Sequence, residues 1–408
     1  MTADTVTPAV QFRRLAVLIA ANFVDMVGFM IVIPLLPFYA LDLNASPVVI
    51  GWIISAFSIA QLISAPVWGR VSDRYGRRPA ILIGLTASAI AYVVFGLATA
   101  VWLLFLSRVI QGLGGGTIGV LHAYVSDMVR PEQRARALGW VSAATSAGVM
   151  IGPALGSLAA HLGQRGPGFV AAGLCLINVF FAWKWLPESR PGTLQAAGTR
   201  RAPVWHAVGQ VFLHPGQKVP RLIWIYAVGM LAFTSLTAVF SLFFEAEYAI
   251  TARTIGYFFF YIGALSFVIR SFLLGPIVER IGEGWAMRVG AIALAVGLVL
   301  YPLMPNLKLV ILVMPLVPIG TALLFPSTTS LMSRYSPEGE VGATMGTAQA
   351  FAGMARVAAP LMATFLFQRL GHAMPFFAAA TVLLLVSMLT LGVATAVEGP
   401  VAEPTTGS

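Results

Sequence analysis

The sequence predicts an all-α integral membrane protein whose twelve transmembrane helices form two six-helix bundles, with both termini in the cytoplasm. The chain has 408 residues, of which 58% are hydrophobic and only 10% are charged. Soluble domains carry roughly 25% charged residues, so this composition indicates burial in lipid. Apolar runs of about 20 residues recur from end to end, each long enough to cross a hydrocarbon core of roughly 30 Å.

The apolar runs define the expected spans. They are residues 15–38, 50–69, 79–99, 101–124, 137–160, 167–186, 221–244, 255–275, 286–305, 308–332, 341–367 and 372–396. The first run contains Asp25 and lacks a small-residue cleavage site, so we expect a retained helix rather than a cleaved signal peptide.

The net charge of +10 invites a comparison with nucleic-acid-binding proteins, but the positions of the basic residues argue against it. With the N-terminus in the cytoplasm, most of the 25 Lys and Arg fall in cytoplasmic loops. Only Arg165, Arg253, Lys308 and Arg369 fall in outer loops. This asymmetry is the positive-inside rule. It predicts a multi-pass protein of the cell inner membrane, with the lipid bilayer as its surroundings and no nucleic-acid partner.

An internal repeat divides the chain. The loop residues Gly69, Asp73, Arg74, Gly76 and Gly84 recur as Gly275, Glu279, Arg280, Gly282 and Gly290, at one offset of 206 positions (275 minus 69). Transporters are often built from such repeats. We therefore expect an N-terminal bundle over 1–186, a cytoplasmic linker over 187–220, a C-terminal bundle over 221–396 and a disordered tail over 397–408. Within the linker, 204–213 is either a short interfacial helix or a flexible loop.

The loop from Gly69 to Pro79 carries the strongest motif, Gly-Arg-Val-Ser-Asp-Arg-Tyr-Gly-Arg-Arg-Pro. With six plus six helices around it, this motif resembles the signature loop of the major facilitator superfamily, and the resemblance covers nearly the whole chain. It implies a cytoplasmic gate in which Asp73 meets the N-terminal end of the span 341–367 and Arg77 meets a carboxylate, here Asp127. The expected gate residues are Gly69, Asp73, Arg74, Gly76, Arg77, Arg78 and Asp127. A merely solvated basic loop is the alternative.

The span 101–124 carries an arginine in lipid. Arg108 needs a partner or water there, because a charge within the bilayer is costly. Gln111 lies about one turn on, on the same face, and Gly112 lets another backbone approach. The run resembles the superfamily motif in which an arginine assists proton exchange. The alternative is a structural arginine bonded to carbonyl groups of a neighbouring helix.

The span 137–160 carries a glycine pattern, which consists of Gly139, Gly148, Gly152, Pro153 and Gly156. It resembles the motif held by drug/proton antiporters and missing from most symporters of the superfamily, although Ser157 replaces its final glycine. The glycines form a groove on one face and Pro153 bends the helix beside it. We expect this smooth, kinked helix to pack tightly against the span 255–275 and to keep the cavity from leaking. Ordinary small-residue packing is the alternative.

Asp25 is the only acid in the middle of any expected span. The run Asp25-Met26-Val27-Gly28, followed by prolines, resembles the first helix of tetracycline and multidrug efflux carriers. At about 1.5 Å per residue, the depths of Asp25 and Arg108 differ by only about 5 Å. We hypothesise that Asp25 is a protonation switch partnered by Arg108, at which substrate competes with the proton. A permanent ion pair of the two is the alternative.

Polar and aromatic residues at similar depth are candidates for the substrate cavity. They are Asn22, Gln111, Tyr257, Tyr261 and Arg356. Arg356 either contacts an anionic group of a substrate or pairs within the protein, and the sequence favours neither.

The resemblance implies a secondary active transporter that exports small apolar or cationic molecules, namely drug-like compounds or secondary metabolites, in exchange for protons by alternating access. Such a protein uses the proton gradient instead of a cofactor, works as a monomer and can confer antibiotic resistance. The alternatives are a proton-coupled uptake symporter for a sugar or organic acid, and a sugar or lipid exporter. An enzyme is disfavoured, because Cys175 is the single cysteine and no nucleophile–base pair or metal cluster is apparent.

Overall fold

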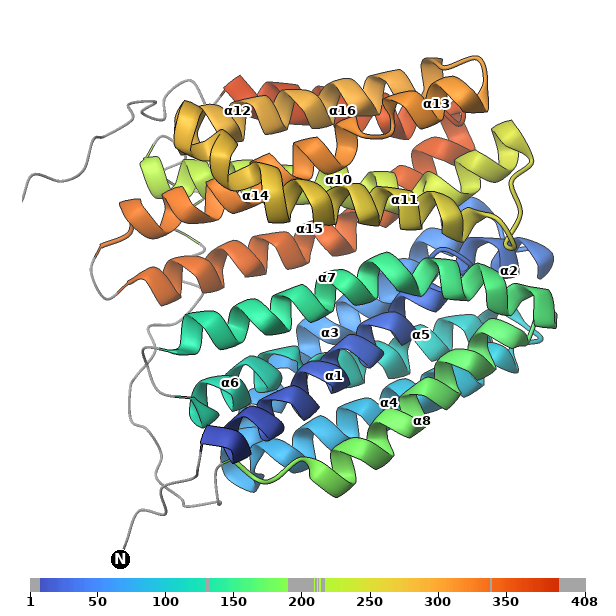
Figure 1. Ribbon diagram of the computed structural model, residues 1–408. Helices are drawn as coiled ribbons and strands as arrows, with labels where there is room; N and C mark the ends of the chain where they lie inside the picture. The colour runs from blue at the N-terminus through green and yellow to red at the C-terminus, as the bar shows by residue number, and fades with distance from the viewer. Residues whose placement is uncertain are drawn as a thin grey trace, which may run out of the picture. The chain divides into compact units, whose positions relative to one another are not determined.

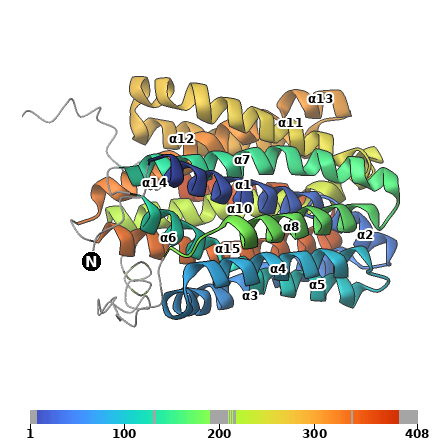
Figure 2. The same cartoon turned by 60° about the horizontal axis from the view of Figure 1, so that its bottom comes forward.

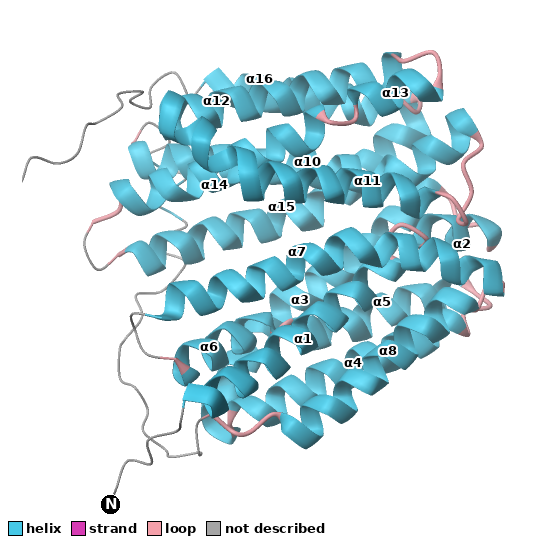
Figure 3. Ribbon diagram, in the orientation of Figure 1, coloured by secondary structure: helices cyan, strands magenta, loops and turns pink. Residues whose placement is uncertain are grey.

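The computed structural model describes residues 8–129, 133–189, 209, 211, 213, 217–337 and 340–388. In this part of the chain every regular element is a helix and there is no strand (Figure 3). Most of the predicted linker and the whole predicted tail lie outside the described residues.

The first series of helices runs to residue 185. Its members are α1 (Pro8–Val32), α2 (Leu36–Asp42), α3 (Pro47–Tyr75), α4 (Arg77–Gly96), α5 (Val101–Gly115), α6 (Ile118–Met128), α7 (Arg134–Ala159), the short η2 (Ala160–Leu162) and α8 (Gly166–Trp185). The second series begins at residue 218. Its members are α10 (Lys218–Tyr248), α11 (Ile255–Val268), the π-helical turn η3 (Ile269–Leu273), α12 (Leu274–Leu303), α13 (Leu307–Val313), α14 (Leu316–Tyr335), α15 (Val341–Leu370) and α16 (Met374–Ser387).

Ten helical runs among the described residues are long and apolar enough to cross a membrane. The predicted spans 255–275 and 286–305 fall in one run, Ile255–Leu303, of 49 residues. At about 1.5 Å per residue this run is more than twice as long as a hydrocarbon core is thick. The predicted span 372–396 begins as α16, and its remainder lies outside the described part.

The long run is interrupted at Gly282, whose backbone leaves the helical region with φ 78° and ψ 158°. Its counterpart in the repeat, Gly76, has φ 102° and ψ 159° and separates α3 from α4. A positive φ favours glycine, since a side chain is strained there. The sequence repeat therefore corresponds to the same backbone turn in both places.

Two spans that the sequence predicts as single helices are interrupted. The first is broken between α1 and α2, where Pro34 lies in a turn and Pro37 opens the next helix. Proline removes a backbone donor and clashes with the preceding turn. The second is broken between α5 and α6, at Gly116 and Thr117, where a run of three glycines weakens the helix.

The described chain forms two compact units. Unit 1 comprises the described parts of Met1–Arg200, Thr234–Phe267 and Arg356–Pro375, and unit 2 comprises those of Arg201–Phe233, Val268–Ala355 and Phe376–Ser408. The predicted division at residues 186 and 221 follows chain order and stays a prediction.

Helix packing in unit 1 positions the site. Helix α1 packs against α7 and α8, and α4 packs against α5 and α8, while α3 packs against α5 (Figure 1). Figure 2 shows the same neighbours from another side. In unit 2, α12 packs along α14.

Candidate functional site

A cavity of about 220 Å³ lies within unit 1. Its lining comes from α1 (Asp25, Met26, Phe29), α3 (Phe57, Gln61), α4 (Gly84, Leu85, Ser88, Tyr92), α5 (Gln111, Gly114, Gly115), the α5–α6 turn (Thr117) and α15 (Arg356). Three predicted site residues, Asp25, Gln111 and Arg356, therefore meet at one cavity. One side of it is apolar: the rings of Phe29 and Phe57 lie 5.0 Å apart at 43°.

Tyr92 is a part of the cavity that the sequence did not predict. Its phenol oxygen accepts a hydrogen bond of 2.6 Å from Gln111 Nε2, which joins α4 to α5. A Cβ on Gly28 would lie 3.1 Å from Tyr92 Cε2, so the bare backbone of α1 makes room for the ring. Tyr92 lies in an apolar run without a motif, where a tyrosine usually signals core packing.

Arg108 is fully buried and does not line the cavity. None of its three guanidinium nitrogens has a hydrogen-bond partner among the described residues. The Tyr92 phenol lies within electrostatic reach of both Asp25 and Arg108. The two predicted partners are therefore not joined by a direct hydrogen bond, and Tyr92 lies close to both.

The other three predicted cavity residues lie elsewhere. Asn22 donates hydrogen bonds to Thr145 Oγ1 at 2.7 Å and to the Val141 carbonyl at 3.2 Å, so its amide is used to bind α1 to α7. Tyr257 is 47% exposed, and neither it nor Tyr261 lines the cavity. Asn22 shares a helix with Asp25, but its side chain points to another neighbour.

The predicted gate loop has a buried arginine at its centre. Arg77 contacts Asp73 at 2.8 Å and Asp127 at 3.2 Å, and it donates to Ser72 Oγ at 2.7 Å. Asp127 is the carboxylate that the sequence predicted for Arg77. Arg74 lies over the ring of Tyr75, while Gly69 faces open space.

Glu188, which the sequence did not predict, binds the start of α4. Its two oxygens accept from the backbone N–H groups of Arg77 at 2.8 Å and Arg78 at 3.1 Å. Arg78 also donates from Nη2 to the Trp183 carbonyl. A Cβ on Gly76 would lie 2.5 Å from Glu188 Oε2, so that glycine is required both by its positive φ and by the carboxylate. A carboxylate at a helix N-terminus is stabilised by the helix dipole.

The glycine groove of α7 packs against α1. A Cβ on Gly148, Gly152 or Gly156 would lie within 3.0 Å of a carbonyl oxygen of α1. Gly139 faces open space. The predicted contact of this helix with the span 255–275 is made by a different face of α7, because the groove's periodicity identifies a face but cannot say which helix occupies it.

Another face of α7 meets the start of α11. Ser157 Oγ donates to the Ala252 carbonyl and accepts from the Gly256 N–H, both at 2.8 Å. A Cβ on Gly256 would lie 2.0 Å from the Pro153 carbonyl oxygen. The serine that replaces the motif's last glycine therefore adds two hydrogen bonds to a close helix contact.

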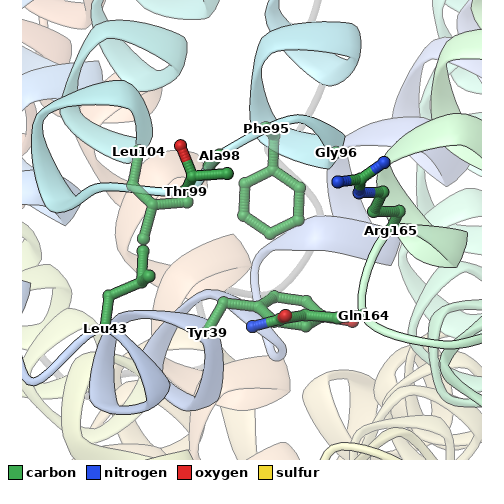
Figure 4. A pocket seen from close by; sticks show the side chains of 9 residues that line it. All are labelled: Tyr39, Leu43, Phe95, Gly96, Ala98, Thr99, Leu104, Gln164 and Arg165. Carbon is green, nitrogen blue, oxygen red and sulfur yellow. The ribbon is translucent and has the colours of Figure 1, made fainter.

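A second cavity, of about 260 Å³, lies at the Gly96 end of α4, one helix length from the gate loop. Figure 4 shows its lining, in which the rings of Tyr39 and Phe95 meet edge to face at 5.3 Å, with Gln164 and Arg165 nearby. It contains none of the predicted site residues. Among the described residues, no group of three His, Cys, Asp or Glu is placed to hold a metal ion.

Comparison with known proteins identifies the family to which this chain belongs. The family model described as Major Facilitator Superfamily matches residues 18–320 and 222–407. The chain is 28% identical to multidrug resistance protein 2 of Bacillus subtilis (strain 168), over 92% of this chain and 94% of that protein. It is 28% identical to the class C tetracycline resistance protein of Escherichia coli, over 87% of this chain and 90% of that protein.

The fold matches that of a solved relative. The match to the crystal structure of the human organic anion transporter MFSD10 covers 93% of this chain and 99% of that chain. Its TM-score is 0.68, and the two sequences are 23% identical. The chain is thus a multi-pass membrane protein that belongs to the major facilitator superfamily, whose members are transporters and not enzymes.

Proposed function

We propose that this protein is a proton-coupled exporter of small drug-like molecules or secondary metabolites, working by alternating access in the inner membrane. The observation that carries the proposal is the cavity, in which Asp25 is the single carboxylate among the described lining residues. The relatives named for multidrug and tetracycline resistance support the direction and the substrate class.

Asp25 is the proposed site of exchange. A substrate with a basic group binds the carboxylate from the cytoplasmic side, and a proton entering from outside neutralises that carboxylate and releases the substrate. Tyr92 lies within electrostatic reach of Asp25, and buried Arg108 lies within reach of Tyr92. Because proton and substrate compete for one group, inward movement of the first drives outward movement of the second.

The proposed topology has twelve spans. The 49-residue run Ile255–Leu303, broken at Gly282, counts as two spans, and α16 begins the last. An even number places both termini on one side, which the distribution of basic residues assigns to the cytoplasm. We propose a monomer as the working unit.

The proposed gate is the junction of α3 and α4 at Gly76, with Asp73 in the last turn of α3 and Arg77 in the first turn of α4. Arg77, held by Asp73 and Asp127, and the α4 start held by Glu188 form a cluster that can break and re-form as a unit. We propose that this cluster latches the cytoplasmic side during alternating access.

The test uses inverted membrane vesicles with an imposed pH gradient, acid inside. Adding a transported drug to wild-type vesicles is expected to release protons, because the drug enters as protons leave. Asp25→Asn is expected to abolish this release, while Asp42→Asn, at the exposed end of α2, retains it. Undiminished release by Asp25→Asn contradicts the proposal. A symporter instead moves protons outward only when the compound is preloaded inside the vesicles.

A further inference from the structure

We infer that the cavity selects amphoteric substrates, in which a basic group pairs with Asp25 and an acidic group pairs with Arg356. The inference rests on the proposed transport function and adds the charges that the substrate carries. Sequence reasoning alone left the role of Arg356 open and favoured neutral or cationic compounds.

Two opposite charges line the cavity. Asp25 comes from α1 and Arg356 from α15, and they are the only ionic side chains among the described lining residues. The remaining polar lining is uncharged and includes Gln61, Ser88 and Tyr92. A ligand that fills this cavity therefore meets one anion and one cation on separate helices.

The position of Arg356 is fixed by packing of α15 against α3. Ser55 Oγ donates a hydrogen bond of 2.9 Å to the carbonyl of Val357, the next residue. One turn further along α15, a Cβ on Gly51 would lie 2.9 Å from the Pro360 carbonyl oxygen. Since Phe57 on α3 also lines the cavity, this contact holds Arg356 at the cavity wall.

The surrounding charge disfavours a purely cationic ligand. Such a ligand neutralises Asp25 but shares the cavity with the positive charge of Arg356, and buried Arg108 lies within electrostatic reach of the lining residue Tyr92. Charges interact strongly where water is largely excluded. An amphoteric ligand instead presents a carboxylate or similar acid to Arg356, and guanidinium–carboxylate pairs are among the strongest hydrogen-bonded contacts.

The apolar side of the cavity suits the scaffold that would carry these two groups. The rings of Phe29 and Phe57 lie 5.0 Å apart, with Met26 and Leu85 also in the lining. Flat aromatic rings pack well against such neighbours. The substrate class is therefore a compact aromatic molecule with a basic group and an acidic group some distance apart.

The two groups have different consequences for coupling. Asp25 exchanges protons, whereas an arginine stays protonated in proteins. Among the described residues, Tyr92 on α4 and Cys175 on α8 lie within electrostatic reach of Asp25, and Arg356 shares its cavity. Protonation of Asp25 therefore releases the basic group only. The acidic group contributes affinity and orientation, so a purely anionic analogue binds without moving protons.

The test compares three forms of one scaffold: a quinolone carboxylic acid with a basic piperazine ring, its methyl ester and its N-acetyl derivative. Their dissociation constants are measured on the purified full-length transporter by fluorescence. The wild type is expected to bind the amphoteric acid about tenfold more tightly than the ester, as one charge-assisted hydrogen bond permits. Arg356→Gln removes this preference but leaves ester binding nearly unchanged. The matched control Arg369→Gln, at the exposed end of α15, behaves as wild type.

Equal binding of acid and ester by the wild type overturns the inference. So does an equal loss of all three compounds in both Arg356→Gln and Arg356→Lys, because Arg356 then supports the fold instead of selecting the substrate. Binding needs no proton gradient. Failure of this inference is therefore distinguishable from failure of antiport, which the vesicle experiment measures.

Discussion

At the scale of single residues, Tyr92 connects the polar parts of the cavity. It receives a hydrogen bond from Gln111, lines the same cavity as Asp25 and lies within electrostatic reach of Arg108. Arg108 is buried without a hydrogen-bond partner among the described residues, and an ionised group in that situation costs several kcal/mol. A change of charge at Asp25 therefore reaches Tyr92, which also lies within reach of a buried arginine that has no hydrogen-bond partner among the described residues.

Removing the Tyr92 hydroxyl should impair coupling more than folding. Tyr92→Phe keeps the ring but leaves buried Gln111 Nε2 without its acceptor, a loss of about 1–3 kcal/mol. Because Tyr92 also lies within electrostatic reach of Asp25, we expect drug-dependent proton release from vesicles to fall about tenfold, which corresponds to a change of about 1.4 kcal/mol in the balance of proton and drug at that carboxylate. Tyr301→Phe is the control, since its buried phenol donates to the Met314 carbonyl in unit 2. Equal release by both variants contradicts a role for Tyr92 in coupling.

Some of these residues were predictable and others were not. Asp25 and Arg356 could be predicted as functional residues, because a charge within an apolar run is costly and therefore indicates a function. Tyr92 and Glu188 could not be predicted. A tyrosine in an apolar helix is equally well explained by core packing, and an acid after a proline by a solvated loop. Their function comes from neighbours on other helices, namely Gln111 and the backbone of Arg77.

At the scale of elements, the contact between α1 and α7 sets the position of Asp25. Gly148, Gly152 and Gly156 allow the α1 backbone to lie against α7, and Asn22 adds hydrogen bonds to the same contact. The glycine spacing predicted a smooth helix face from the sequence alone. The identity of the neighbour depended on the packing of the whole bundle, which periodicity does not encode.

A methyl group in this groove should push the two helices apart. A Cβ on Gly152 would lie 2.5 Å from Met30 Cβ and 2.9 Å from the Val27 carbonyl oxygen. We expect Gly152→Ala to destabilise the protein by about 1–3 kcal/mol, as overpacking does, and to displace α1 with Asp25. Thermal unfolding in detergent measures the effect.

Gly139 is the matched control on the same helix, because a Cβ there meets nothing within 4 Å. Gly139→Ala should be neutral or stabilising, by up to about 1 kcal/mol from helix propensity. If Gly152→Ala is as stable as Gly139→Ala, the groove does not hold α1 as described.

At the scale of the whole molecule, the repeat and the charge distribution support the proposed topology. Gly76 and Gly282 make the same backbone turn at corresponding positions, which ties the sequence repeat to structure. Composition and run length predicted the helical membrane architecture. The breaks after α1 and α5 and the π-helical turn η3 were less predictable, because they depend on local strain within otherwise apolar runs.

The proposed topology predicts which loops face outward. In a Cys175→Ser background, Gln164→Cys should react with a membrane-impermeant maleimide in intact cells, because that topology places the α7–α8 connection outside. Arg74→Cys, in the gate loop, should react only after the cells are opened. Labelling of both positions in intact cells contradicts the assigned orientation.

The central claim is that proton and substrate compete for Asp25. The most direct measurement is proton release when an amphoteric drug binds the purified transporter in weakly buffered solution on the acid side of neutrality. The account predicts release of up to one proton per bound drug by the wild type and none by Asp25→Asn. Equal release by both proteins, or drug binding by the wild type without any release across that pH range, would contradict it.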